Sequence, residues 1–128
     1  MARYPAAGCF GSVASFSGFV QHQRPEVEVG LRAVGGVEYT DIFGPMEAFY
    51  ATGHNPTRLA ANLTRSRLYV TVGDGVPDLT AGSSPTAIVG GAAVEAGLRR
   101  QSEELVAAAR AAGVDTTYRP LTGIHDWP

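Results

Sequence analysis

The sequence has a single cysteine, little net charge and no long hydrophobic run. Ten arginines, without any lysine, stand against twelve acidic residues and leave a net charge of −2 over 128 residues. This charge is spread along the chain, so the basic surface that nucleic-acid binding needs is missing. Cys9 has no partner for an internal disulfide or a thiolate metal site. No apolar run reaches the roughly 18–20 residues that cross a bilayer, which excludes a transmembrane segment.

Targeting and metal-binding patterns are also lacking. Residues 1–5 show no charged segment that leads into an apolar one, so we expect no signal peptide in this chain. The compartment, cytoplasmic or exported, stays open. His22, His54 and His125 do not have the helical or hairpin spacing of metal ligands. We therefore expect no metal site.

Three segments have the character of β-strands and one has helical periodicity. Residues 11–18 alternate small polar and apolar side chains, residues 67–73 are almost continuously apolar, and residues 115–121 form the third strand. Residues 92–112 predict one long helix with Gly113 at its C-cap. The side chains predicted to form its buried stripe are Val94, Leu98, Leu105, Val106 and Ala109.

A long segment rich in glycine and proline separates the first two strands. We predict that residues 19–62 are mostly irregular, with a short helix at residues 45–50 and a single turn at residues 56–60. Pro45 suits the first turn of that short helix. Irregular stretches of this length often serve as lids or inserts.

The order strand, loop, strand, helix, strand predicts an α/β fold with a mainly parallel sheet and right-handed crossovers. A parallel sheet needs helices on both faces, and this chain supplies one long helix. No helical pattern follows residues 115–121. We interpret residues 1–128 as one partial domain that belongs to a larger sheet.

The strongest candidate for a catalytic residue is His125. Active groups of α/β sheets gather beyond the carboxyl ends of the strands, and His125 follows the last strand. Its imidazole can accept a proton at one ring nitrogen while a carboxylate holds the other. The alternative is a histidine of a surface loop without a role.

Four motifs in order along the chain resemble one enzyme family. They are residues 2–18, which end in Ser15-Phe16-Ser17-Gly18, and residues 62–77, 94–97 and 123–128. Together they resemble the C-terminal half of the esterase family that includes the mycolyltransferases of the antigen 85 type and is related to the esterase D group. The resemblance covers nearly the whole chain and implies the C-terminal portion of an α/β-hydrolase fold.

The resemblance also implies two members of a catalytic triad. His125 matches the triad base, and Glu95, near the start of the long helix, matches the acid. In related esterases the acid follows the preceding strand directly, so Asp78 is the alternative acid and Asp74 a weaker one. Glu95 also has an ordinary interpretation, because an acid in a first helical turn is favoured by the dipole and Arg99 lies one turn on.

The nucleophile of such enzymes is a serine on a strained G-x-S-x-G turn, and the sequence has no such motif. Ser15-Phe16-Ser17-Gly18 is nearest, but it lacks the first glycine and no helical pattern follows it. In the family this turn would lie shortly before Met1. The resemblance therefore implies a serine esterase or acyltransferase that is present without its nucleophile and oxyanion hole. We expect the fragment to be inactive alone.

The resemblance implies no metal or organic cofactor. The implied partners are a small-molecule or lipid ester and, for a mycolyltransferase, a carbohydrate acceptor. The alternative function is a non-catalytic interaction module of hydrolase ancestry. A truncated parallel sheet exposes an unpaired strand edge, which would favour self-association.

Overall fold

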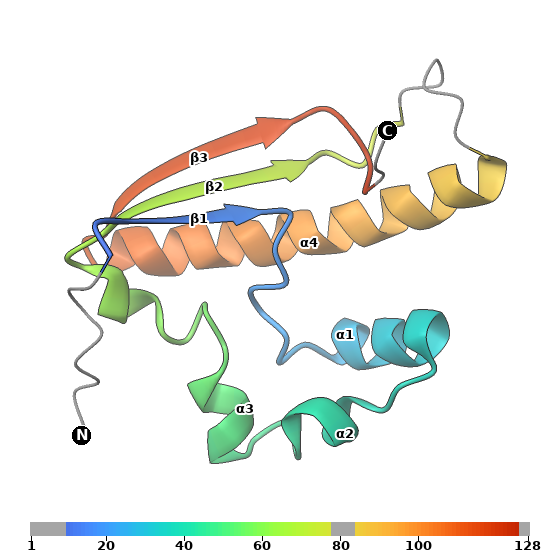
Figure 1. The fold of residues 1–128 in the computed structure, drawn as a ribbon, viewed down its shortest axis with the longest axis horizontal. Helices are drawn as coiled ribbons and strands as arrows, with labels where there is room; N and C mark the ends of the chain where they lie inside the picture. The colour runs from blue at the N-terminus through green and yellow to red at the C-terminus, as the bar shows by residue number, and fades with distance from the viewer. Residues whose placement is uncertain (1–9, 78–83, 126–128) are drawn as a thin grey trace.

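The computed structural model describes residues 10–77 and 84–125. Its three strands are β1 (Ser12–Phe16), β2 (Arg67–Gly73) and β3 (Asp115–Leu121), and they form a parallel sheet in the order β1-β2-β3 (Figure 1). The prediction of an α/β fold with a parallel sheet of about three strands is confirmed. None of the described helices combines the length and the apolarity that crossing a membrane would require.

Strand β2 occupies the centre of the sheet because it is the most apolar of the three. Leu68, Val70 and Val72 are at most 2% exposed. Strand β3 pairs with β2 along its full length, whereas β1 pairs only as far as Phe16 opposite Thr71. The last two residues of β2 therefore pair with β3 alone, and a notch is left at the carboxyl end of β1.

Helix α4 (Pro85–Ala111) runs along one face of the sheet (Figure 1). It begins at Pro85 rather than at the predicted residue 92, because proline is well suited to a first helical turn and the following small and apolar residues continue the helix. It ends where Gly113 adopts a φ of +80° and the N–H of Val114 bonds to the carbonyl of Ala109 at 2.9 Å. Gly113 thus terminates the helix as predicted.

The buried stripe of α4 is shorter than expected. Leu98, Leu105, Val106 and Ala109 are buried as predicted, but Val94 is 38% exposed. Toward its N-terminus, α4 extends past the ends of the strands (Figure 1), so this part of the helix has less of the sheet to pack against.

The segment between β1 and β2 contains more helix than predicted. It forms short elements that lie below α4 in Figure 1, and they are α1 (Pro25–Gly30), the π-helix η1 (Leu31–Gly35), α2 (Tyr39–Phe43), α3 (Phe49–Gly53) and the 3-10 helix η2 (Ala60–Leu63). The helix predicted at residues 45–50 is wrong. The N–H of Ala48 bonds to the carbonyl of Pro45 at 2.8 Å and closes a turn, and the extended backbone of Ala48 delays the helix to Phe49.

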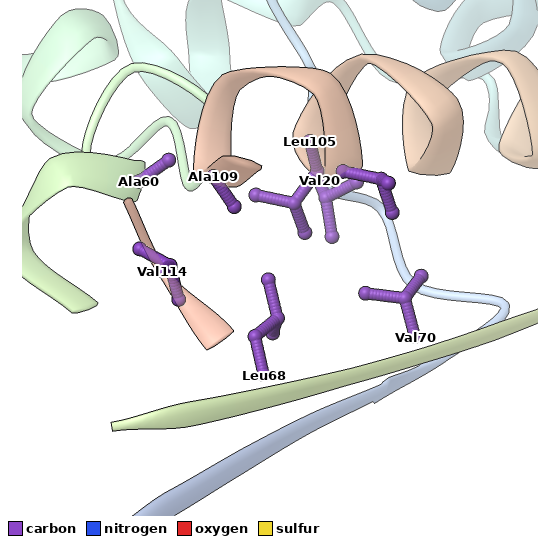
Figure 2. Close-up of a cluster of buried hydrophobic side chains, with 8 residues drawn as sticks. Val20, Ala60, Leu68, Val70, Leu105, Ala109 and Val114 are labelled. Carbon is purple, nitrogen blue, oxygen red and sulfur yellow. The ribbon is translucent and has the colours of Figure 1, made fainter. Parts of the chain in front are cut away.

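The hydrophobic core lies where α4 meets β2 and the segments on either side of the short helices. Figure 2 shows its side chains converging from these elements. The labelled members are Val20, Ala60, Leu68, Val70, Leu105, Ala109 and Val114. Each fully buried Val or Leu contributes roughly 1.5–3 kcal/mol to the free energy of unfolding. This core fixes α4 against β2 and thereby fixes the position of every side chain that α4 directs toward the sheet.

Polar contacts attach the segment after β1 to the outer side of α4. The N–H of Gln21 donates to Gln101 Oε1 at 3.0 Å, and Arg24 forms an ion pair with Glu104. The C-terminal half of α4 therefore lies between the sheet and the segment that follows β1.

The opposite face of the sheet is uncovered in the described part of the chain. Phe16 and Leu121 are 69% and 57% exposed, and the ring of Phe16 contacts that of Tyr69 at a centroid distance of 6.0 Å. Parallel sheets are normally covered on both faces. This apolar surface is where a further layer would pack.

Candidate active site

Glu95 and His125 meet beyond the carboxyl end of β2. Glu95 comes from α4, and His125 comes from the loop that follows β3. Glu95 Oε2 lies 2.9 Å from His125 Nδ1. The side chain of Glu95 is 2% exposed, whereas that of His125 is 41% exposed. The structure therefore brings the two sequence-predicted residues together as a buried carboxylate and a half-exposed imidazole.

The second oxygen of Glu95 is bound to the sheet. Oε1 accepts hydrogen bonds from the hydroxyl of Ser17, just after β1, and from the backbone N–H of Gly73, at the end of β2. A buried carboxylate is costly unless its oxygens are hydrogen-bonded, and these donors satisfy that requirement. One oxygen thus fixes the carboxylate to the sheet, and the other faces His125.

The notch at the end of β1 makes this contact possible. Because β1 pairs only as far as Thr71, the N–H of Gly73 is available to a side chain from α4. Glu95 approaches so closely that a Cβ on Gly73 would lie 2.8 Å from Glu95 Cγ and would overlap the carbonyl oxygen of Gly123. Only glycine leaves space for both groups.

Backbone contacts hold the loop that carries His125. The N–H of His125 donates to the carbonyl of Gly91 at 3.2 Å, and the N–H of Gly75 donates to the carbonyl of Gly123 at 2.8 Å. Asp74 Oδ1 accepts hydrogen bonds from the backbone N–H of Val76 at 2.9 Å and from that of Gly123 at 3.1 Å. These hydrogen bonds lower the pKa of Asp74 from its ordinary value, and the amide of Val76 has the larger effect. Asp74 thus joins the end of β2 to the histidine loop.

Neither of the other two candidates for the acid, Asp74 and Asp78, is seen in contact with His125 in the described part of the chain. The carboxylate of Asp74, the weaker alternative, is hydrogen-bonded to the amides of Val76 and Gly123, while it is Glu95 that contacts His125. Asp78, the main alternative, lies outside the described residues. The ordinary interpretation of Glu95, an ion pair with Arg99, is wrong. Glu95 faces the sheet, and Arg99 pairs with Glu103 at 3.0 Å.

Two of the residues that contact Glu95, Ser17 and Gly73, are not predicted from the sequence. From the sequence, Ser17 stands out only as part of the run nearest to a nucleophile motif, and Gly73 only as the end of a strand. Their contacts with Glu95 span 78 and 22 residues of sequence. The available signal was a Ser-Gly pair directly after one strand and a glycine at the end of the next, at the edge where α/β folds collect active groups.

The remaining histidines belong to other environments. His22 is 2% exposed, its ring stacks on Phe43 at 4.0 Å, and its Nδ1 lies 2.8 Å from the hydroxyl of Tyr39. Burial lowers the pKa of His22. His54 is exposed beside Tyr50. Among the residues that the structure describes, no three His, Cys, Asp or Glu side chains form a group that could hold a metal ion.

Comparisons with known proteins establish the fold. No protein-family model matches the chain, and no curated protein is similar to it in sequence. Among solved structures, that of MPT51 (FbpC1) from Mycobacterium tuberculosis, an antigen 85 family member with an α/β-hydrolase fold, matches with a TM-score of 0.58 and 24% identity. The match covers 92% of this chain but 45% of MPT51, so the chain spans less than half of that protein's length. The described residues are thus part of an α/β-hydrolase fold.

The chemistry available to the pair follows from its geometry. A carboxylate on Nδ1 favours the imidazole tautomer that carries its proton on that nitrogen. The other nitrogen, Nε2, is then free to accept a proton from a nucleophile. This tautomer is assigned from the hydrogen-bond partners.

Proposed function

We propose that Glu95 and His125 are the acid and the base of a serine-dependent acyl-transfer enzyme, an esterase or acyltransferase of the α/β-hydrolase class. The observation that carries the proposal is their 2.9 Å contact beyond the carboxyl end of the central strand. In α/β sheets this edge is where ligands bind. A buried carboxylate that orients a half-exposed imidazole matches the arrangement of a hydrolase triad.

The residue roles follow. A serine outside the described residues attacks the ester carbonyl as its hydroxyl proton passes to Nε2 of His125. Glu95 holds the imidazole and stabilises its positive charge. The proton then passes to the leaving alcohol, and an acyl-serine remains. Water, or a hydroxyl of an acceptor, next gives its proton to His125 and takes the acyl group, and His125 then returns that proton to the serine oxygen as the acyl–serine bond breaks.

The proposed substrate is a small-molecule or lipid ester, with a carbohydrate hydroxyl as the acceptor if transfer prevails. We propose that residues 1–128 are a partial hydrolase domain without turnover of its own. A positioned base without its nucleophile and oxyanion donors retains little of the rate enhancement. The nucleophile turn would be placed by a strand next to β1, whose second edge carries no strand in the described part.

The test begins with the native protein. Peptide mapping in the source cells defines its N-terminus, and the native-length protein is assayed with p-nitrophenyl esters beside residues 1–128 alone. We expect a G-x-S-x-G serine upstream and hydrolysis only by the native-length protein. His125→Ala should abolish this hydrolysis, while His54→Ala, at an exposed histidine, should not. A native protein that begins at Met1, or activity that persists in His125→Ala, would overturn the proposal.

A second candidate function is a non-catalytic interaction module. The exposed apolar face around Phe16, Tyr69 and Leu121 favours it, because such surfaces mark association sites. Light scattering of residues 1–128 separates the candidates when it is combined with the mapped N-terminus. A chain that begins at Met1 and forms a defined oligomer, which Phe16→Asp dissociates, would favour the module.

A further inference from the structure

Ser17 is held in a conformation that serine rarely adopts. Its φ is +44°, and among the described non-glycine residues it alone has a positive φ. Such backbone costs energy and is retained where the surrounding structure requires it, often at active sites. Two contacts impose it here. The N–H of Ser17 donates to the carbonyl of Thr71 at 2.9 Å, and Gly18 packs against Ser15 so tightly that a Cβ would overlap the Ser15 hydroxyl.

This conformation directs the hydroxyl of Ser17 at Glu95 Oε1. The hydrogen bond from its N–H to Thr71 attaches the backbone of Ser17 to β2, so the hydroxyl reaches Glu95 from a fixed point on the sheet. With the N–H of Gly73 as the second donor, Oε1 is bound from two strands. Rotation of the carboxylate is thereby restricted, and Oε2 is left facing His125 Nδ1.

We propose that Ser17 is a positioning residue, whose hydroxyl orients the carboxylate of Glu95 and through it the imidazole of His125. The inference deepens the proposed function and rests on it for the catalytic meaning of the pair. Ser17 is not the nucleophile, because its hydroxyl donates to the acid and does not engage the base. The strained turn after β1 thus connects the first strand to a site formed by α4, the end of β2 and the loop after β3.

The first test uses the chain itself and requires no activity. Proton NMR of protein labelled with 15N-histidine detects the Nδ1–H resonance of His125, which is shifted downfield by a carboxylate partner. We expect this resonance in the wild type and in Ser12→Ala, a serine at the start of β1. We expect its loss through exchange with water in both Ser17→Ala and Ser17→Gly. Ser17→Gly is the sharper variant, because glycine accepts the positive φ without strain and lacks only the hydroxyl.

The outcomes are decisive in either direction. A wild-type resonance in Ser17→Gly would show that Ser17 only shapes the turn, and the inference would be overturned. Unfolding of both variants, seen in the backbone amide spectrum, would equally assign Ser17 a structural role alone. Covalent labelling of Ser17 by a fluorophosphonate would make it a nucleophile and would overturn the inference as well.

A second readout applies to the native-length enzyme. Ser17→Gly should lower kcat about tenfold, the scale of one hydrogen bond, with KM unchanged. Failure of the two proposals is distinguishable. If the native-length protein hydrolyses no ester, the proposed function fails, while the NMR resonance still decides whether Ser17 orients the pair.

Discussion

The side chains of Glu95 and His125 are separated by 30 residues in sequence, yet their Oε2 and Nδ1 atoms lie 2.9 Å apart. The long helix supplies one and the last loop the other, and both are fixed to the end of β2. Gly73 binds the carboxylate directly, and Asp74, its neighbour, binds the loop of the imidazole at Gly123. The end of one strand therefore determines the distance between the two catalytic candidates.

Replacement of Glu95 by glutamine should leave the fold intact and remove catalysis. The amide oxygen can still accept from Ser17 and Gly73, so the amide nitrogen is turned toward His125 and donates to Nδ1. The imidazole then adopts the wrong tautomer, and kcat of the native-length enzyme should fall by about 10⁴-fold. Glu103→Gln, an exposed glutamate on the same helix, is the control and should change kcat little. A Glu95→Gln enzyme with near wild-type kcat would contradict the assignment.

Replacement of Gly73 by alanine should damage both stability and the site. The new Cβ would lie within 3 Å of Glu95 Cγ and Oε1. Relief of this overlap moves α4 or the histidine loop, at a cost of about 1–3 kcal/mol of unfolding free energy. Urea denaturation measures the loss, and the Nδ1–H resonance of His125 should disappear. Gly97→Ala on α4, where nothing lies within 4 Å of the added Cβ, is the control and should be neutral or stabilising.

Replacement of Asp74 by asparagine should change how the free energy of unfolding depends on pH in the acidic range. The amides of Val76 and Gly123 lower the pKa of Asp74 below 3.8 in the folded state. The unfolded chain therefore binds the proton first, and the stabilisation is complete above pH 3.8 and is lost as the pH falls through the lowered value. Asp74→Asn should be less stable than the wild type near pH 7, and the difference should shrink below pH 4. Denaturation series at several pH values measure this.

Replacement of His22 by phenylalanine should flatten the pH dependence of stability near neutrality. Burial lowers the pKa of His22 below 6.5, so the unfolded chain takes up a proton that the folded chain excludes. Wild-type stability should be constant above pH 6.5 and should fall as the pH decreases below it. The groups that face the ring are Tyr39, hydrogen-bonded to Nδ1, and His54, whose charge opposes protonation.

Thermal unfolding between pH 8 and pH 5 measures this slope. His22→Phe should be less stable than the wild type at pH 8, because Tyr39 loses its hydrogen-bond partner. Between pH 8 and pH 5, however, the variant should lose less stability than the wild type loses. An unchanged slope in His22→Phe would place the titrating group elsewhere.

The two halves of α4 should differ in their contribution to stability. Leu105 is 2% exposed and belongs to the core, whereas Val89 is 71% exposed on the part of the helix that extends past the strands. Leu105→Ala should lower the free energy of unfolding by about 2–5 kcal/mol. Val89→Ala should change it by no more than about 0.5 kcal/mol. Equal losses in denaturant titrations would mean that the N-terminal half is also packed.

Those parts of the fold that depend on local pattern could be predicted from the sequence. Strands β2 and β3 were predicted with their observed bounds, because apolar or β-branched runs end there at a glycine or a turn. Helix α1 was missed although Pro25 and two acidic residues mark its first turn. Six residues are too few to show a helical period, and its ion pair with α4, between Glu26 and Arg100 at 3.2 Å, spans 74 residues of sequence.

The site was predictable only in part. His125 follows from its place after a strand, and Glu95 from the resemblance to an enzyme family. Ser17 could not be predicted as a partner of Glu95, because a contact across 78 residues leaves no local pattern. Nor does the sequence show that β1 ends before β2, since that depends on strand register.

The parallel register of the sheet determines how a misaligned strand in this protein would be detected. The pairing of Arg67 with Asp115 continues to Gly73 with Leu121, and His125 follows four residues later. A slip of β3 by one residue would preserve the amount of strand but carry the histidine loop about 3.3 Å along the sheet. It would also exchange the two faces of β3. Circular dichroism would scarcely detect this misalignment, because the amount of strand is unchanged. The contact between Glu95 and His125 would be lost, however. That contact is therefore a sensitive criterion of correct strand alignment.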